Sequence, residues 1–445
     1  MSEKTRNILY FALVAVLLIG TAIFQSPNTA LFILNMGLIS AIMALGVNLQ
    51  WGFAGLFNVG VMGFVALGGL AVALTSMPPA PGAWAPQGAP LILVALGCGA
   101  ATVALAVYAQ KKMAAGRNKV LATVGILVVG FLIYRAIFDP AVGFVEAITP
   151  ATSGNIGGLN PGGENFKAHG YMTIVGWGFG GVLAAGAAWV IGKTALGLRS
   201  DYLAIATLGI AEIIIAVMKN EDWLARGVKN IIGLPRPVPY EIDLQNSESF
   251  VANANSIGID PVTASTLYVK LGYSVLFTIV LVVIFLMAQA ALKSPWGRMM
   301  RAIRDNEVAA EAMGKDVTNR HLQIFILGSA VCGIAGAMMT TLDSQLTPGA
   351  YQPLRFTFLI WVMVIVGGSG NNLGAVLGGF VIWFFWVQVE PMGLALMQLI
   401  TAGMADGSAL KTHLIDSAAH MRLLTMGLIL LLVLRFSPRG LIPEK

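Results

Sequence analysis

Residues 267–292 read LYVKLGYSVLFTIVLVVIFLMAQAAL, and residues 293–321 continue as KSPWGRMMRAIRDNEVAAEAMGKDVTNRH. The first stretch is long and apolar enough to cross the roughly 30 Å hydrocarbon core of a bilayer, which takes about 20 helical residues. The second stretch is basic and polar, so it must lie outside that core. This succession predicts a membrane helix that ends in an extramembrane connection.

The composition indicates that most of the chain lies in a membrane. Of 445 residues, 57% are hydrophobic and 11% are charged, whereas about 25% of the residues of a soluble domain are charged. The 52 glycines suit membrane helices, which pack closely through small residues. The net charge of +6 is scattered over predicted helix ends rather than gathered into a stripe, which argues against nucleic-acid binding.

Apolar runs recur along the whole chain and predict an all-α fold, a polytopic inner-membrane helical bundle with about 8–12 spans. The N-terminal run lacks a small-residue cleavage site, so we interpret it as a retained helix rather than a signal peptide. Glycines interrupt the runs within residues 31–77 and 354–392, which predicts broken or re-entrant helices there. The predicted spans are 9–25, 31–50, 57–77, 90–109, 119–138, 171–192, 201–218, 267–292, 322–342, 354–370, 373–392 and 421–436.

Positive charge predicts the orientation, because cytoplasmic loops of membrane proteins carry an excess of Lys and Arg. With the N-terminus inside, both termini are cytoplasmic and residues 293–321 form the main cytoplasmic segment. Residues 139–170 and 219–266 then form irregular periplasmic loops, rich in turn-forming residues. The Lys and Arg residues predicted on the inner side are Lys4, Arg6, Lys111, Lys112, Arg117, Lys119, Lys193, Arg199, Lys293, Arg298, Arg301, Arg304, Lys315, Arg320, Arg435, Arg439 and Lys445.

The cytoplasmic segment 293–321 predicts two short helices in succession. Asn306 can cap the N-terminus of the second helix, which we place over residues 307–313. Gly314 suits the position just beyond the end of that helix, where a left-handed backbone is common. The segment therefore predicts a rigid double-helix hairpin between two spans.

The second of these helices carries a small apolar face, Val308, Ala309 and Ala312, between the carboxylates of Glu307 and Glu311. Such a face suits docking into a groove on another protein. The alternative is an amphipathic connection that lies on the lipid surface, which the basic residues before it also favour. The residues alone do not separate these two interpretations.

Five polar residues inside predicted spans are candidates for a translocation path. Glu212 lies in the middle of a span, where exposure of its charge to lipid costs a few kcal/mol. Asn48 and Asn58 lie in one glycine-interrupted region, and Asn371 and Asn372 lie in another. Broken helices can line a polar path with their backbone groups and amides. The alternative is that the asparagines cap these helices or form hydrogen bonds between them.

Sequence features of an enzyme are missing. Residues 186–194 (GAAWVIGKT) resemble a phosphate-binding loop, but Ala187 stands where glycine is required and the context is a membrane span. Cys98 and Cys332 cannot build a disulfide framework, and the four histidines show no metal-ligand spacing. No nucleophile and base are arranged for catalysis. We therefore predict that the chain has no catalytic residues, metal, cofactor or ATP site of its own.

Several segments, in this order along the chain, resemble permease subunits of branched-chain amino acid ABC transporters, and most closely the longer of the two permease types. Urea-type permeases of the same family are also similar. The segments are LQWGFAGLFNVG (49–60), LRSDYLAIATLGIAEII (198–214), IIGLPRP (231–237), GRMMRAIRDNEVAAEAMG (297–314), GSAVCGIAGAMMTTLDSQLTPGAY (328–351), MVIVGGSGNNLGAVLGG (363–379) and LRFSPRGLIP (434–443).

The resemblance implies a single transmembrane permease domain over residues 1–445, with 293–321 as its cytoplasmic coupling segment. It implies as partners a second homologous permease, two ABC ATPase subunits and a periplasmic solute-binding protein, with membrane lipid around them. It also favours docking over attachment to the lipid surface. The ATPase-coupling residues expected from it are Arg301, Arg304, Glu307, Ala310, Glu311 and Gly314.

On the same resemblance we expect an ATP-driven importer of branched-chain or other neutral amino acids in a bacterial inner membrane. The alternatives are a urea or short-amide permease and a stand-alone ion-coupled carrier, which would lose transport on Glu212→Gln. The chain departs from the family in longer loops at 78–90 and 139–170. Its segment ARGVKNIIG (225–233) also lacks the Gly-Asn-Gly run that relatives often have there. These departures leave the substrate open.

Overall fold

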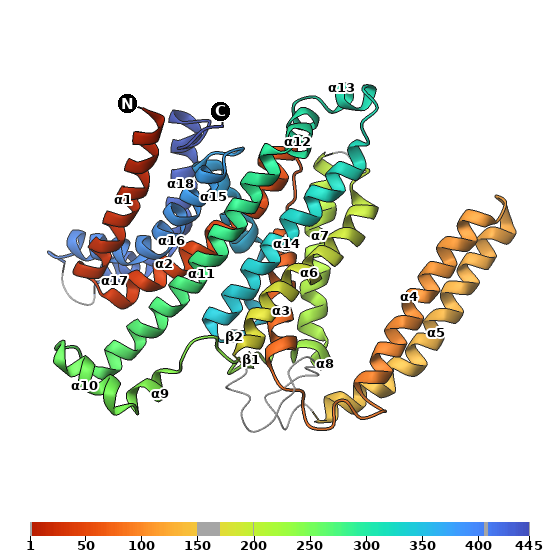
Figure 1. Cartoon of the computed structure of the whole chain (residues 1–445), viewed down its shortest axis with the longest axis horizontal. Helices are drawn as coiled ribbons and strands as arrows, with labels where there is room; N and C mark the ends of the chain where they lie inside the picture. The colour runs from red at the N-terminus through yellow and green to blue at the C-terminus, as the bar shows by residue number, and fades with distance from the viewer. Residues whose placement is uncertain (1, 149–169, 199, 405–407, 445) are drawn as a thin grey trace.

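The computed structural model describes residues 2–148, 170–198, 200–404 and 408–444, and nearly all of its regular structure is helical (Figure 1). The all-α prediction is confirmed. Two short strands, β1 (Ile231–Ile232) and β2 (Gln345–Leu346), pair antiparallel. The helices are α1 (Glu3–Phe24), α2 (Pro27–Val47), η1 (Asn48–Gly52), α3 (Val61–Ser76), α4 (Ala89–Lys112), α5 (Arg117–Ile148), α6 (Tyr171–Ala195), α7 (Ser200–Asn220), α8 (Asp222–Ala225), α9 (Glu241–Gln245), α10 (Glu248–Ser256), α11 (Pro261–Lys293), α12 (Pro295–Asp305), α13 (Glu307–Ala312), α14 (Val317–Asp343), η4 (Pro348–Ala350), η5 (Leu354–Phe358), α15 (Leu359–Gly367), α16 (Asn372–Ile400), α17 (Ala409–Asp416), η6 (Ser417–His420) and α18 (Met421–Phe436).

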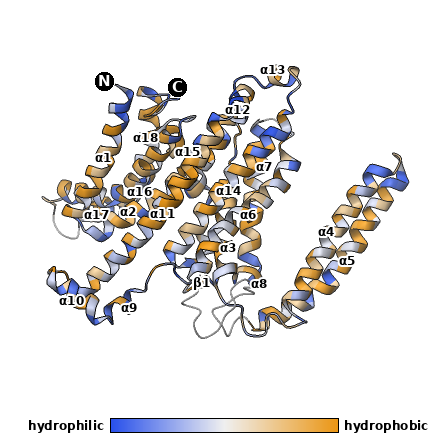
Figure 2. Ribbon diagram, in the orientation of Figure 1, coloured by the Kyte–Doolittle hydropathy of each residue, from blue (hydrophilic) through white to orange (hydrophobic). Residues whose placement is uncertain are grey.

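Among the described residues, nine helices are long and apolar enough to cross a membrane, or ten if the bent pair α17 and α18 counts as one span. This number lies within the predicted range. Figure 2 shows hydrophobic residues along the middle of the long helices and hydrophilic residues toward their ends. Helix α3 and the pair η5–α15 are apolar but shorter than the roughly 20 residues of a full crossing. The prediction of broken helices within 31–77 and 354–392 is confirmed.

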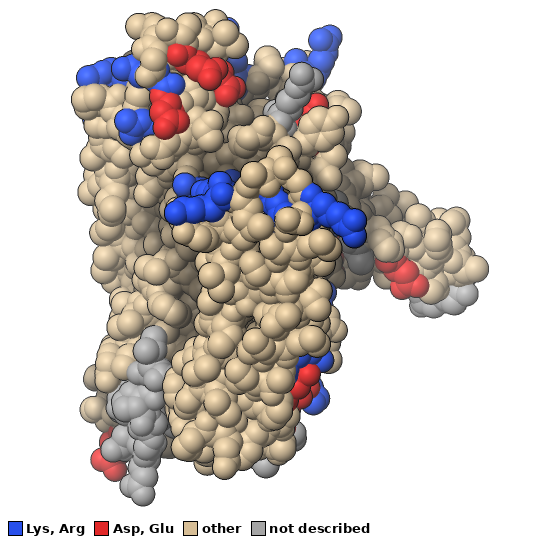
Figure 3. Space-filling model, turned by 90° about the vertical axis from the view of Figure 1, so that its right-hand side faces the viewer, with Lys and Arg blue, Asp and Glu red and all other residues tan. Residues whose placement is uncertain are grey.

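Both termini lie at the same end of the bundle as α12, α13 and the turn between α4 and α5 (Figure 1). We call this end the terminal face. The strands and helices α8, α9 and α10 lie at the other end, which we call the opposite face. Figure 3 shows Lys and Arg side chains gathered at the tip of the α4–α5 hairpin, where Lys111, Lys112, Arg117 and Lys119 lie. The segments predicted as cytoplasmic thus share one face, and the side of the membrane to which that face belongs stays a prediction.

Helix α2 occupies the centre of the bundle. Every residue from Asn35 to Val47 is buried, and the helix packs against α11, α14, α15 and α16. A helix whose residues are buried on every side is surrounded by other protein rather than by lipid. The polar groups at its end are therefore held away from lipid.

Glycines allow α3, α6 and α14 to pack at close range. A Cβ atom on Gly68 of α3 would lie 1.9 Å from the carbonyl oxygen of Gly333 in α14. A Cβ atom on Gly336 would lie 2.0 Å from the carbonyl oxygen of Val65, and one on Gly333 would lie 2.5 Å from that of Gly180 in α6. The three helices therefore touch backbone to backbone, and any side chain at these positions forces them apart.

Gly336→Leu is expected to destabilise the folded protein by about 3 kcal/mol or more, because overpacking a filled contact usually costs 1–3 kcal/mol and here the obstacle is backbone. Thermal unfolding in detergent, followed by size-exclusion chromatography, measures the effect. Gly178→Leu on α6 is the matched control, since a Cβ atom there meets nothing within 4 Å. Equal melting temperatures for the two variants would contradict the close α3–α14 contact.

The α4–α5 hairpin stands to one side of the other helices (Figure 1). Most of its apolar side chains are exposed in this chain. Near the opposite face, Phe138 packs edge-on against Trp223 of α8, with ring centroids 5.8 Å apart. The hairpin is therefore anchored close to one end and covered elsewhere by lipid or another protein.

Two predictions of irregular loops need correction. Residues 139–148 are the last turns of α5 rather than loop, because Ala141 and Val145 are buried in an apolar cluster with Ile92 and Trp223. Pro140 suggested a loop, but membrane helices tolerate proline within their length. The rest of that predicted loop, residues 149–169, lies outside the described residues.

The predicted loop over residues 219–266 is partly ordered into α8, β1, α9 and α10, and α11 already begins at Pro261. Its prolines and polar residues suggested irregular backbone. The chain instead folds short helices onto the opposite face, where β1 pairs with β2 through Ile231 and Leu346.

Candidate functional site

Helices α12 and α13 form a hairpin on the terminal face, between the long helices α11 and α14. Met300 and Ile303 of α12 are fully buried and fix it to the bundle. The Asn306 side chain accepts a hydrogen bond from the Ala309 backbone N–H at 3.0 Å, and Gly314 has φ +76°. The predicted double helix, with its asparagine cap and terminal glycine, is confirmed.

The outward surface of α13 combines apolar and acidic side chains. Val308 and Met313 are 77% and 78% exposed, and the carboxylates of Glu307 and Glu311 are exposed beside them. Ala310, another residue of the predicted contact set, is buried within the chain's own core. Met313 is also part of this surface, although it was not predicted there from the sequence.

The two predicted coupling arginines are directed inward rather than toward the outer surface of the hairpin. Arg301 donates to the carbonyl oxygen of Leu292 at the end of α11 (3.3 Å). Arg304 donates to the carbonyl oxygen of Gly52 (2.5 Å) and to the carboxylate of Glu444 (2.7 Å). They therefore connect the hairpin to the bundle.

Arg304 keeps its charge in this half-buried position. Burial by itself would lower the pKa of Arg304, but its hydrogen bonds to Glu444 and Asp305 raise it overall. A guanidinium that donates to two carboxylates forms charge-assisted hydrogen bonds, which are stronger than neutral ones. Arg304 thus fixes the end of α12 in place.

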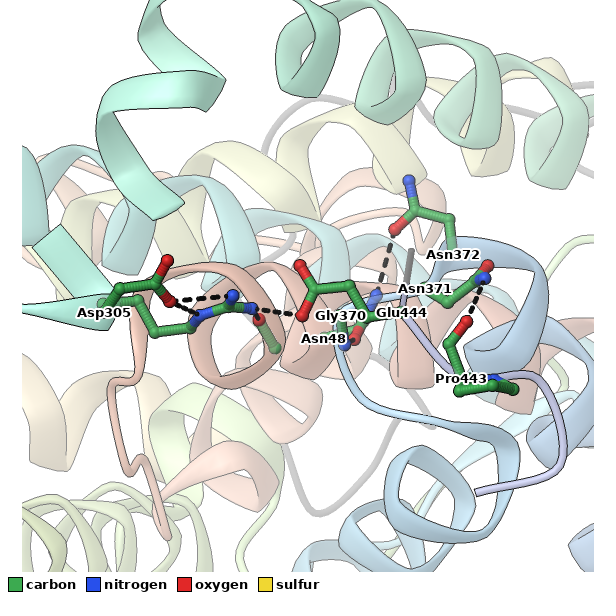
Figure 4. A network of polar contacts seen from close by, with 9 residues as sticks. Asn48, Asp305, Gly370, Asn371, Asn372, Pro443 and Glu444 are labelled. Atoms are coloured by element: carbon green, nitrogen blue, oxygen red, sulfur yellow. Dashed lines mark hydrogen bonds and ion pairs between the residues drawn. The ribbon is translucent and has the colours of Figure 1, made fainter. Parts of the chain in front are cut away.

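Three of the predicted path residues meet where the helices break (Figure 4). Asn48 donates to the side-chain oxygen of Asn372 at 3.0 Å and accepts from the backbone N–H of Gly370 at 2.9 Å. Asn371 caps α16 and donates to the carbonyl oxygen of Pro443 at 3.1 Å. The asparagines of two distant segments therefore form one polar cluster.

Residues 439–444, which we call the C-terminal strap, join this cluster to the hairpin. The backbone N–H groups of Leu441 and Ile442 donate to the carbonyl oxygens of Val366 and Gly367, both at 2.9 Å. Glu444, at the end of the strap, forms an ion pair with Arg304. Figure 4 shows Glu444 between Asp305 on one side and the asparagine cluster on the other. Glu444 was not predicted from the sequence, because a lone carboxylate in a polar tail carries no pattern.

Asn58 belongs to a separate buried group. Its side chain donates to Gln50 at 2.9 Å and accepts from the Gly60 backbone N–H at 2.9 Å. Gln50 in turn donates to the Phe325 carbonyl oxygen and to Ser329. This arrangement joins the chain after η1 to α14 and matches the alternative of interhelical hydrogen bonding. Asn372 differs, since its buried side-chain N–H₂ has no partner among the described residues.

Glu212 does not join either group. It lies on the exposed side of α7, next to Ile213, which is 61% exposed. A carboxylate at mid-span that faced only hydrocarbon would cost a few kcal/mol. This face of α7 therefore requires a cover other than lipid.

The chain was compared with known proteins. The family of branched-chain amino acid transport system permease components matches residues 29–156 and 160–434. The chain belongs to this family. As a member, it is a multi-pass membrane permease subunit of an ABC transporter and a transport protein rather than an enzyme. Its relatives support the longer permease type.

Individual relatives agree with the family. The permease is 24% identical over 409 residues to the probable branched-chain amino acid transport permease protein LivM of Methanocaldococcus jannaschii, covering 91% of this chain and 90% of that one. It is 27% identical over 204 residues to the high-affinity branched-chain amino acid transport system permease protein LivM of Salmonella typhimurium, covering 44% and 46% of the two chains. A shorter match, 26% identical over 105 residues, joins it to the fructose import permease protein FrcC of Rhizobium meliloti, covering 23% and 29%. No solved structure matches the permease.

The geometry assigns different tasks to the predicted residues of the permease. The outward side chains of α13 form a surface that another protein can cover. Arg304, the strap and the asparagine cluster form a polar connection from the end of α12 to the break between α15 and α16. Among the described residues, no three His, Cys, Asp or Glu side chains lie close enough together to hold a metal ion.

Proposed function

We propose that the permease is one membrane subunit of an ATP-driven importer that carries branched-chain or other neutral amino acids across a bacterial inner membrane. The observation that carries this proposal is the α12–α13 hairpin, a capped and rigid projection between α11 and α14 whose outer surface is left uncovered. The names of the relatives that match most of the chain, or about half of it, support the amino acid substrate.

In the proposed complex the terminal face is cytoplasmic and each permease docks on one ATPase subunit through α13. Val308 and Met313 provide the apolar contact, and Glu307 and Glu311 select a basic rim on the ATPase. Closure of the ATPase pair displaces the hairpin. Because α12 is held by Arg304, the displacement reaches both the long helices and the polar cluster at the break.

The remaining surfaces suit the other proposed partners. The opposite face, with α9 and α10, receives the periplasmic solute-binding protein. A second, homologous permease covers part of the apolar flank, and the exposed carboxylate of Glu212 on α7 favours that flank over a surface that faces only lipid.

Reconstitution tests the proposal. The permease is expected to co-purify with an ATPase and a second permease, both identifiable by mass spectrometry. Proteoliposomes with this complex and its binding protein should take up radiolabelled leucine only when ATP is enclosed. Uptake by the single chain with an ion gradient alone would favour a stand-alone carrier, and uptake of urea instead of leucine would overturn the substrate.

A further inference from the structure

A small cavity of about 150 Å³ lies near the opposite face, away from the asparagine cluster. Its walls come from the first half of α2, the end of α14, the segment after β2, η5 and α16. None of the residues predicted for the translocation path lines it. An engineered cavity of about the same volume in another protein holds benzene, so the space suits a small solute rather than a peptide.

Two opposite charges line this cavity without pairing with each other. Asp343 is the last residue of α14, and Arg355 lies in η5. Both side chains are accessible, and no ion pair joins them within the described chain. The Arg355 guanidinium is held over the rings of Phe356 and Trp386, at 5.2 and 5.8 Å from their centroids. The arginine is therefore positioned by aromatic faces rather than by a carboxylate.

Two polar groups of the same cavity have no hydrogen-bond partner in the part of the chain that the structure describes. Trp383 is only 4% exposed, and its buried indole N–H has no hydrogen-bond partner among the described residues. The hydroxyl of Thr347 is also buried and unpaired. A buried polar group without a hydrogen bond destabilises a structure, so two such groups in one small cavity indicate that a ligand or water completes them.

The rest of the wall is largely apolar. Phe32 and Met36 of α2 line it opposite the polar groups contributed by later segments. A mostly apolar lining with a few placed polar groups is typical of a site for a small molecule. Here the polar groups comprise one anion, one cation and two hydrogen-bond donors.

We propose that this cavity is the permease's own binding site for a neutral aliphatic amino acid in its zwitterionic form. The ammonium group of the solute pairs with Asp343, and its carboxylate pairs with Arg355 and accepts from Trp383 and Thr347. The aliphatic side chain lies against Phe32 and Met36. This inference rests on the proposed function and adds a selective site within the membrane subunit to the selectivity expected of the binding protein. Urea would leave both charges unpaired, and a sugar would leave the apolar wall unmatched.

Equilibrium binding of radiolabelled leucine to the purified membrane complex in nanodiscs, without the binding protein, tests the inference. We expect saturable binding that weakens roughly tenfold or more in Asp343→Asn and in Arg355→Gln, and several-fold in Trp383→Phe, which removes little more than the N–H donor. Asp243→Asn on α9 makes the same chemical change on an exposed residue of the opposite face and should leave binding unchanged.

Competition separates recognition from a structural role. Leucinol lacks the carboxylate and isocaproate lacks the ammonium group, so each should compete at least about tenfold less well than leucine for the wild-type site. Asp343→Asn should specifically erase the preference for leucine over isocaproate, which a merely structural aspartate would not do. Urea should not compete.

Wild-type complex that binds no leucine, or variants that bind it as tightly as wild type, would overturn the inference. The same proteoliposomes distinguish this failure from failure of the proposed function. If wild-type complex takes up leucine with ATP and the Asp343 and Arg355 variants do so equally well, the cavity is not the site while the importer assignment stands. If wild-type complex takes up no neutral amino acid, the importer assignment fails first.

Discussion

Replacement of both Glu307 and Glu311 by lysine is expected to reduce ATP-driven uptake by roughly a hundredfold while the permease still reaches the membrane. The carboxylates flank the exposed Val308 and Met313 on α13, and like charges brought together at an interface cost several kcal/mol. The two side chains are exposed, so their replacement should leave the fold of the subunit intact. Uptake of leucine and hydrolysis of ATP by reconstituted complexes, measured in parallel, give the effect.

The ratio of the two activities is the informative quantity. We expect ATP hydrolysis to persist and to lose its dependence on substrate-loaded binding protein, because the ATPase no longer binds the hairpin tightly. The control reverses Glu3, which is exposed at the start of α1 on the same terminal face, and should leave uptake unchanged. Normal uptake by the α13 variant would count against α13 as the docking element.

Arg304→Glu is expected to lower the free energy of unfolding by about 2–4 kcal/mol and to impair coupling, since it places a third carboxylate beside those of Glu444 and Asp305. The side chains of Arg304 and Glu444 are 23% and 29% exposed, so solvent screens the pair only in part. Exchanging the charges, as Arg304→Glu with Glu444→Arg, should recover much of the loss. Recovery will be incomplete, because the hydrogen bond to the carbonyl oxygen of Gly52 is not replaced.

Chemical denaturation and the number of leucine molecules transported per ATP hydrolysed measure the two consequences separately. If the exchange variant is no more stable than Arg304→Glu alone, the ion pair does not hold the strap. If stability recovers and transport per ATP is normal in all variants, the strap stabilises the fold but has no role in coupling.

The positions of the helices could be predicted from the sequence better than the contacts between them. Long apolar runs gave spans that overlap the observed helices, and Asn306 and Gly314 correctly marked the ends of α13. Residues 139–148 were misjudged because Pro140 and Gly143 are turn signals in water, whereas a membrane helix carries them. Local sequence patterns depend on residues within one segment. They therefore predict secondary-structure elements but not the contacts between segments.

The candidate site shows the same limit. The asparagines of the two breaks were predicted as candidates for a translocation path, without a prediction that the two breaks meet. The structure brings Asn48 to Asn372, and their role in a path stays a prediction. Glu444 was not predictable, because its partner Arg304 lies 140 positions away and neither residue carries a pattern that names the other. The exposed position of Glu212 depends on which side of α7 the bundle covers. Asp343 and Arg355 were not predicted as site residues, because charged residues are common near the ends of membrane spans.

The α4–α5 hairpin is attached to the other helices close to one end, and this affects how the subunit responds to the thickness of the bilayer. Helix α5 has 32 residues, or roughly 48 Å at 1.5 Å per residue, which exceeds the hydrocarbon thickness of about 30 Å. Charged residues lie within this length, among them the ion-paired Arg135 and Asp139, so part of the helix protrudes from the hydrocarbon core or the helix tilts. Because the hairpin packs on α8 far from the strap, it can lean as lipid thickness changes without strain reaching Arg304 or the asparagines. The hairpin would then adapt to the membrane while the transport machinery keeps its geometry.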